Sequence, residues 1–260
     1  MGDSLTDPSP FYGVRPSASW PEVLAVSLRA ANKDYKARNF GVSGDTTCQM
    51  LGRISQMSYY DVPNIAAIFG GVNDPGAATT VNGAGATTTT VPVQSGKAAA
   101  LVGGYVTISG ETRLVLSRST DTITLATPLS TAPASTTAVS VATQRNIEEM
   151  IDAIQAAGCQ KIIVISAHYL NFSSGGDTTS TPYAAYVPVR AAQQAAATAQ
   201  GVVFCDLYAW MRQLIVSGTD TQGSNSWHAF ANNQHLNTYG ESIVAAAVLA
   251  RIQAQQPNWA

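Results

Sequence analysis

The chain has 260 residues, of which 45% are hydrophobic and only 12% are charged, and its formal net charge is −2. This length is sufficient for one α/β domain with a sizeable core, or for one domain that carries an insertion. The sequence has no basic cluster, which argues against a nucleic-acid-binding protein, and no apolar run long enough to predict a membrane span.

The first predicted helix begins at residue 19. Ser19 can cap this helix, Glu22 can complete a capping box, and Pro21 suits the first turn. A short strand is predicted over residues 35–42 and a helix near residues 50–57. Residues 65–69 are apolar on both faces, which predicts a buried parallel strand.

Helices and buried strands alternate again after residue 144. The pattern predicts a helix from 145 to 158, a strand over 161–166, a helix over 188–200, a strand over 202–205 and a closing helix over 239–253. This alternation predicts an α/β protein, a three-layer α/β/α sandwich with a mostly parallel sheet.

Residues 75–144 interrupt the alternation. The segment is rich in Thr, nearly uncharged, and contains β-branched runs bounded by turn residues. A loop of this length without structure of its own is unusual, so we predict a small inserted β-rich subdomain. The main domain would then comprise residues 1–74 and 145–260. A disordered linker is the alternative that the composition leaves open.

Four short segments contain residues suited to acyl transfer. They are Gly-Asp-Ser-Leu-Thr at 2–6, Asn-Phe-Gly-Val-Ser-Gly-Asp-Thr at 39–46, Gly-Val-Asn-Asp at 71–74, and the segment 232–240 around His235. Each alone is typical of an ordinary turn. Together, in this order, they resemble the four motif blocks of the SGNH hydrolase superfamily, also called GDSL esterases and lipases. The resemblance covers residues 1–74 and 145–260.

The resemblance implies a serine esterase that uses neither metal nor cofactor. It assigns Ser4 as the nucleophile and His235 as the general base. The backbone N–H groups of Ser4 and Gly44, with the side-chain amide of Asn73, would form the oxyanion hole. These roles satisfy the physical needs of acyl transfer, which are a nucleophile, a base and donors for the developing negative charge. Asp3 and Asp74 would hold neighbouring loops by hydrogen bonds.

One departure from the family pattern concerns the third member of the catalytic triad. The family usually has Asp three residues before the histidine, where this chain has Asn232. An Asn carbonyl can accept a hydrogen bond from the imidazole but carries no charge to stabilise the imidazolium. Three explanations stay open: a Ser–His dyad helped by Asn232 or a backbone carbonyl, a substitute carboxylate such as Asp220, or weakened activity. We favour the first.

The second departure lies at the start of the chain. The family has a β-strand immediately before Gly-Asp-Ser, and here only Met1 precedes that motif, with no visible secretory signal. We expect the strand to be absent, or to be supplied by another segment or by another chain, which makes a homo-oligomer one expectation. The low charge content favours an extracellular or particle-associated protein over a cytoplasmic one.

The expected substrate is a small-molecule ester or an O-acetylated glycan, with His168 and Trp227 as candidate substrate-binding residues. A catalytically inactive binding or structural module, either glycan-binding or oligomer-forming, is the alternative function. The presence of Ser4, Gly44, Asn73 and His235 together favours the enzyme. Cys48, Cys159 and Cys205 lack metal-ligand spacing, so we expect buried thiols and no metal site, with one disulfide as the alternative.

Overall fold

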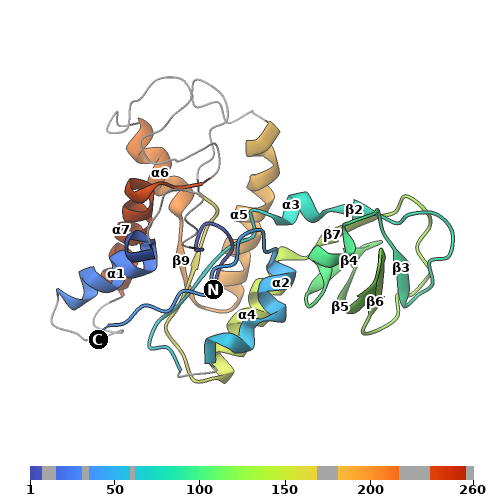
Figure 1. The fold of residues 1–260 in the computed structure, drawn as a ribbon, viewed down its shortest axis with the longest axis horizontal. Helices are drawn as coiled ribbons and strands as arrows, with labels where there is room; N and C mark the ends of the chain where they lie inside the picture. Colours follow the sequence, from blue (N-terminus) through green and yellow to red (C-terminus); the bar gives the residue numbers. More distant parts are fainter. Residues whose placement is uncertain (8–15, 31–34, 59–61, 169–180, 217–234, 256–260) are drawn as a thin grey trace.

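The computed structural model describes residues 1–7, 16–30, 35–58, 62–168, 181–216 and 235–255. A parallel sheet with helices on both faces forms the body of the protein (Figure 1). Its strands lie in the order β1 (Ala66–Phe69), β8 (Ile162–Ile165) and β9 (Val203–Cys205). The predicted three-layer α/β/α sandwich is therefore confirmed.

The helices divide into two layers. One face is covered by α1 (Trp20–Arg29), α6 (Leu207–Val216) and α7 (Thr238–Ala254), and the other by α2 (Thr47–Gly52), α4 (Thr143–Ala156) and α5 (Thr181–Ala199) (Figure 1). Short 3₁₀ helices occupy Pro16–Ala18, Ile54–Ser58 and Ala98–Leu101.

The central strand β8 explains how the two layers are joined. Its four residues are completely buried. Because side chains alternate along a strand, Ile163 and Ile165 pack in the cluster that contains α1 and α7. Ile162 and Val164 pack in the cluster that contains α4. The sheet thus buries both faces, as its continuous apolar sequence predicts.

Met1 and Gly2 lie beside β1 and pair with it. Gly2 bridges both Gly41 and Phe69 in the parallel sense. The carbonyl of Met1 accepts from the Phe69 N–H at 3.0 Å, and the Met1 ammonium donates to the Ala67 carbonyl at 2.9 Å. Met1 and Gly2 therefore lie at the position beside β1 where the family resemblance implies a strand.

A channel of about 350 Å³ continues from Met1 beyond this short pairing. It runs between residues 35–40 and 62–67, and α1 and α7 contribute apolar side chains such as Leu24 and Ile252. Burial, and after it the positive charge of Arg53, lower the pKa of the Met1 amino group to about 5. This amino group is therefore mostly uncharged at neutral pH, which suits its apolar surroundings.

Residues 79–141 form a second, antiparallel sheet. Its strands are β2 (Thr79–Thr80), β3 (Thr90–Pro92), β4 (Tyr105–Ile108), β5 (Glu111–Ser119), β6 (Thr122–Leu125) and β7 (Ala138–Val141), in the order β2-β7-β4-β5-β6-β3. A bridge between Val81 and Val93 joins the two edges of this sheet, which therefore closes on itself around its own apolar cluster. We call this unit the insertion.

The insertion is held against α2 and α4 by polar contacts. Asn146 of α4 accepts from the N–H of Tyr105 at 2.6 Å and donates to its carbonyl at 3.2 Å. Thr46, which precedes α2, donates through Oγ1 to the carbonyl of Ala100 at 2.5 Å. The start of β4 and the neighbouring 3₁₀ turn are thus fixed to the body of the protein.

Several local predictions differ from the structure. Residues 35–40 form no strand, and only Gly41 of the predicted segment bridges Gly2. The α1 capping box is also wrong: the Ser19 hydroxyl donates to the Pro16 carbonyl, and Glu241 of α7 accepts from the N–H of Trp20 at 2.7 Å. Tertiary contact replaces the local cap in this case.

The structure also tests the predictions made for the later helices and for the cysteines. Helix α5 begins at Thr181, so that Pro188 lies inside it, and α6 was not predicted. Cys48, Cys159 and Cys205 are buried and free, so the alternative of a disulfide is wrong. No helix among the described residues combines the length and apolarity needed to cross a membrane.

Candidate active site

Ser4 and His235 are brought together although 231 positions separate them. Nε2 of His235 lies 3.1 Å from Oγ of Ser4, which is within hydrogen-bonding distance. His235 comes shortly before α7, whose first turn is capped by the side chain of Asn237, which accepts from Tyr239 and Gly240 at 2.9 and 3.0 Å. This cap fixes the end of the helix that follows the histidine.

The turn that carries Ser4 is organised by Asp3. Oδ1 of Asp3 accepts from the N–H of Leu5 at 2.9 Å. The backbone carbonyl of Asp3 accepts from the backbone N–H groups of Thr6 and Asp7, both at 3.0 Å. The pKa of Asp3 is raised to about 7, first by burial and then by the negative charge of Asp74. Backbone N–H groups, that of Leu5 first among them, partly oppose this rise.

The segment 39–46 lies against the nucleophile turn. Asn39 donates to the Thr6 carbonyl at 2.5 Å and accepts from the N–H of Gly41 at 2.8 Å. A Cβ at Gly41 would lie 2.3 Å from the Asp7 nitrogen, so only glycine permits this approach. Gly44 has φ +83°, a left-handed conformation that also favours glycine.

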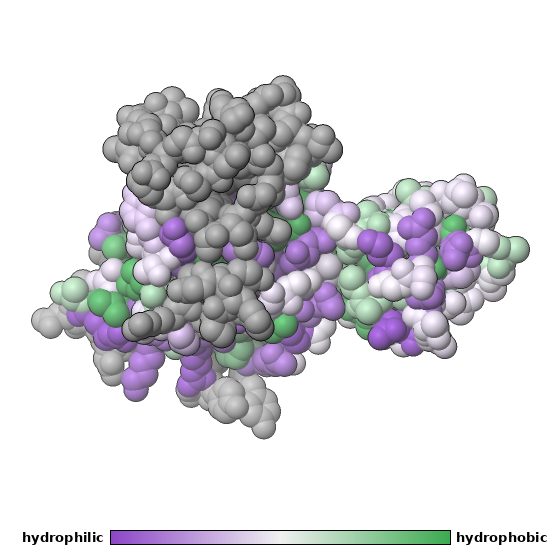
Figure 2. All heavy atoms as spheres, turned by 45° about the horizontal axis from the view of Figure 1, so that its top comes forward, coloured by the Kyte–Doolittle hydropathy of each residue, from purple (hydrophilic) through white to green (hydrophobic). Residues whose placement is uncertain are grey.

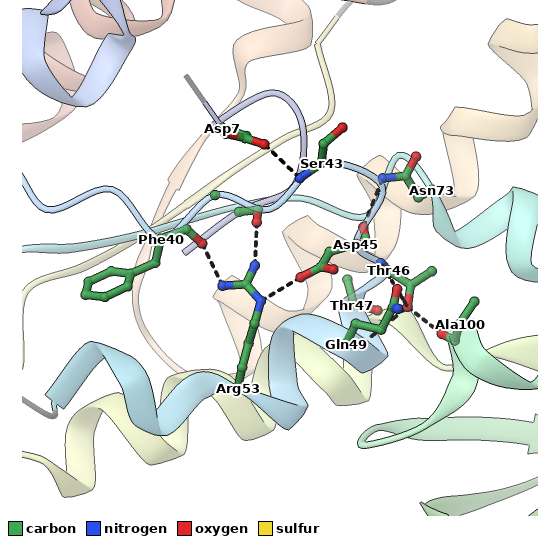
Figure 3. Close-up of polar contacts among 12 residues, drawn as sticks. Asp7, Phe40, Ser43, Asp45, Thr46, Thr47, Gln49, Arg53, Asn73 and Ala100 are labelled. Atoms are coloured by element: carbon green, nitrogen blue, oxygen red, sulfur yellow. Dashed lines mark hydrogen bonds and ion pairs between the residues drawn. The ribbon is translucent and has the colours of Figure 1, made fainter. Parts of the chain in front are cut away.

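Arg53 ties these two segments together (Figure 3). Its guanidinium donates to the carbonyl of Phe40 at 2.7 Å and to that of Gly2 at 2.8 Å, and it pairs with Asp45 at 2.6 Å. A planar guanidinium can make all three contacts in fixed directions. Arg53 therefore sets the spacing between the turn of Ser4 and the loop of Gly44.

Asn73 and Asp74 complete the arrangement at the end of β1. Nδ2 of Asn73 donates to the carbonyl of Asp45 at 2.9 Å, which orients the amide toward the Gly44 loop (Figure 3). Asp74 accepts from the N–H and hydroxyl of Thr47 at 2.8 and 2.6 Å, and from Thr143 at 2.6 Å. This agrees with the loop-holding role predicted for Asp74, whose pKa burial raises to about 6.

Hydrogen-bond donors remain available beside the Ser4 hydroxyl. Among the hydrogen bonds of the described residues, none uses the backbone N–H of Ser4 or that of Gly44. The second N–H of the Asn73 amide is also uncommitted there, because an amide nitrogen carries two donors. Burial lowers the pKa of His235 below its ordinary value of 6.5, which favours the neutral imidazole that a general base requires.

Other predicted site residues cannot be placed in the same way. Asn232 and Trp227 lie outside the residues that the structure describes, as does Asp220. His168 follows β8 and is only 1% exposed. The predicted substrate contacts of His168 and Trp227 stay predictions. Within the described ranges, no cluster of three His, Cys, Asp or Glu side chains could hold a metal ion.

Arg53 is the residue of this site that sequence reasoning missed. A single arginine in a helical segment carries no signal of its function, because its partners are mainly backbone carbonyls.

One local signal was nevertheless present at the start of α2: Thr46 and Gln49 form a capping box, with Gln49 accepting from the Thr46 N–H at 3.0 Å. That pattern places the helix start at Thr47.

Comparison with known proteins gives a family match and several similar folds. Residues 1–241 match the GDSL-like Lipase/Acylhydrolase family. No curated protein matches the chain in sequence. Among solved structures, an acetyl xylan esterase is 12% identical, with a TM-score of 0.59 and 97% of each chain covered.

Two bacterial structures are similar in the same sense. A catalytic mutant of an acetylxylan esterase from Geobacillus stearothermophilus is 12% identical, covers 96% of this chain and 91% of its own, and has a TM-score of 0.59. A lipase/acylhydrolase from Enterococcus faecalis is 18% identical, with coverage of 98% and 93% and a TM-score of 0.52. At this identity the likeness concerns the fold. The family match over most of its length shows that the chain belongs to the GDSL-like lipase/acylhydrolase family and is a carboxylic ester hydrolase.

Proposed function

We propose that the chain is a serine esterase that hydrolyses short-chain, acetyl-type carboxylic esters by a Ser–His mechanism. The observation that carries this proposal is the distance of 3.1 Å between Oγ of Ser4 and Nε2 of His235. A serine hydroxyl is a weak nucleophile unless an adjacent base removes its proton, and this geometry supplies that base.

The proposed reaction has two similar halves. Oγ of Ser4 attacks the ester carbonyl carbon while His235 takes the hydroxyl proton, and the negative oxygen of the tetrahedral intermediate is held by the N–H groups of Ser4, Gly44 and the Asn73 side chain. Collapse of the intermediate expels the alcohol, which takes the proton from His235. Water then repeats the sequence on the acyl-enzyme, with His235 again as base and then as acid.

The oxyanion donors are supported by their rigid setting. Arg53 and Asp45 fix the loop of Gly44, and the Asp45 carbonyl orients the amide of Asn73. Donors that are already oriented need no reorganisation during the reaction, and one such donor contributes about 2.7–4 kcal/mol to lowering the barrier. The imidazolium formed during turnover would be supported by Asn232 or by a backbone carbonyl.

The proposed substrate class is narrower than that of the family. Two of the similar structures are described as acetylxylan esterases, which supports a carbohydrate O-acetyl ester as the natural substrate. The charged fraction of only 12% supports an extracellular or particle-associated location, where such substrates occur.

The test is hydrolysis of p-nitrophenyl acetate by the purified protein. Ser4→Ala and His235→Ala should each abolish turnover above background. Ser27→Ala, whose hydroxyl only donates to the Val23 carbonyl within α1, is the control and should retain wild-type activity. Undiminished turnover in Ser4→Ala would contradict the proposal, and absence of turnover in the folded wild-type protein would favour a binding or structural role.

A further inference from the structure

A groove with a volume of about 620 Å³ lies between the insertion and the body of the protein. Its walls come from α3 (Asp74–Ala77), α5, the start of α4, and strands β4, β5 and β7. Figure 2 shows the insertion as a separate lobe joined to the body by a narrower waist. The volume falls in the range of roughly 300–1,000 Å³ that is typical of ligand sites.

One lining residue of this groove is the chain neighbour of the proposed oxyanion residue Asn73. Asp74 follows Asn73 directly and lines the groove. A Cβ placed on Gly71 would lie 3.3 Å from Val189 and 3.5 Å from Thr143, and both of these residues line the groove. The wall of the groove therefore packs directly against the loop that carries Asn73.

The polar lining of the groove is rich in hydroxyl groups. Its uncharged polar side chains are Thr107, Thr112, Ser140, Thr143 and Gln144. The charged side chains in the lining already have partners: Arg145 pairs with Glu148 at 3.8 Å and also with Glu149. Buried Asp74 is held by threonine hydroxyls.

The other lining residues are apolar. They are Pro75, Ala78, Val141, Ala142, Ala185, Pro188, Val189 and Ala192. An anionic ligand would need an uncompensated cation, which the described lining does not offer. A saccharide suits both parts of the lining, because its hydroxyl groups donate to and accept from threonine and serine hydroxyls while its C–H faces contact apolar surface.

We infer that this groove binds the saccharide portion of an O-acetylated glycan, so that the insertion selects the alcohol part of the substrate. The inference rests on the proposed esterase function and gives a role to a unit that lies outside the catalytic residues. A small ester such as p-nitrophenyl acetate is too short to need the groove, whereas an acetylated polysaccharide extends into it.

A matched pair of substitutions on one strand tests this role. Thr112 and Leu116 both lie on β5 and are both exposed, but only Thr112 lines the groove. Thr112→Trp should obstruct the groove and lower kcat/KM on chemically acetylated xylan about tenfold, mainly through KM. Leu116→Trp should change that value by no more than about twofold, and both variants should keep wild-type activity on p-nitrophenyl acetate.

A binding measurement separates this inference from the proposed reaction. In a Ser4→Ala background, the protein should bind xylooligosaccharides, glucomannan or pectin fragments in calorimetry, and Thr112→Trp should weaken that binding while Leu116→Trp should not. Equal behaviour of the two variants, or no binding to any of the three glycans, would overturn the inference. If the wild-type protein hydrolysed p-nitrophenyl acetate no faster than Ser4→Ala, the proposed function would be overturned instead.

Discussion

The guanidinium of Arg53 donates a hydrogen bond of 2.8 Å to the backbone carbonyl of Gly2, two residues before Ser4. The same group pairs with Asp45, which lies next to Gly44 in the loop of the proposed oxyanion hole. One side chain thus links the proposed nucleophile to the proposed oxyanion donors. The arginine and aspartate side chains are only 15% and 10% exposed, so this ion pair is shielded from solvent.

Substitution of Arg53 should lower both stability and activity. Arg53→Gln leaves Asp45 without its partner and should destabilise the protein by about 3 kcal/mol, because removing one member of a buried ion pair leaves an uncompensated charge. It should also lower kcat on p-nitrophenyl acetate, since the two loops lose their common support. Urea denaturation and steady-state kinetics measure these two effects.

The matched control is Arg113→Gln in the insertion. Arg113 pairs with Glu111, and their side chains are 22% and 23% exposed. Loss of this more exposed pair should have a much smaller effect on stability, because solvent screens exposed ion pairs, and should leave kcat unchanged. If Arg53→Gln behaved like Arg113→Gln in both measurements, the contacts that Arg53 makes with Gly2, Phe40 and Asp45 would have no functional role.

Glu241 should make the stability of the protein depend on pH. Burial raises the pKa of Glu241 to about 7, while its side chain accepts from the N–H of Trp20. The folded protein therefore binds more protons than the unfolded chain between about pH 4.5 and 7, and this contribution to stability is lost as the pH rises through 7. Glu241→Gln keeps an acceptor and removes the charge.

The expected result is a pH-dependent gain in the Gln variant. Relative to the wild type, Glu241→Gln should be more stable at pH 8 by on the order of 2–3 kcal/mol and nearly equal at pH 4.5. Glu241→Ala, which lacks the acceptor, should be less stable than Glu241→Gln at both pH values. An equal effect of the Gln substitution at both pH values would show that Glu241 has no raised pKa.

The pH profile of esterase activity should report the environment of His235. Burial lowers the pKa of this imidazole, so kcat/KM should decline on the acid side with a midpoint below the ordinary value of 6.5. Asn232→Asp adds a carboxylate that stabilises the imidazolium. It should therefore move the midpoint to higher pH and raise the plateau or leave it unchanged. A large loss of activity in Asn232→Asp would refute the dyad supported by Asn232.

The parallel sheet was predictable because its strands are buried on both faces. The apolar residues at 162–165 have no polar alternation, and such runs indicate strands between two helical layers. The strand predicted at 35–42 is not formed: residues 35–40 have no regular structure, and Gly41 alone makes a bridge, to Gly2. Local propensity was therefore an insufficient guide to this element.

Sequence order revealed the candidate catalytic residues but not their support. Ser4 and His235 lie in motifs whose order along the chain is diagnostic, whereas Arg53 and Glu241 act on backbone groups of distant segments. Backbone carbonyls and N–H groups exist at every residue, so the sequence gives no sign of which one a side chain contacts. Those contacts follow from the fold alone.

The homo-oligomer expected from the sequence is tested by light scattering of the protein in solution. A folded monomer of 27.1 kDa would contradict that expectation.

The central claim is that Ser4 is a nucleophile activated by His235. The most direct test is covalent labelling with a fluorophosphonate, followed by mass spectrometry of the digested protein. We predict one adduct per chain, on the peptide that contains Ser4, and its loss in His235→Ala. An adduct on another serine, or no adduct on a folded protein that hydrolyses p-nitrophenyl acetate, would contradict the proposed mechanism.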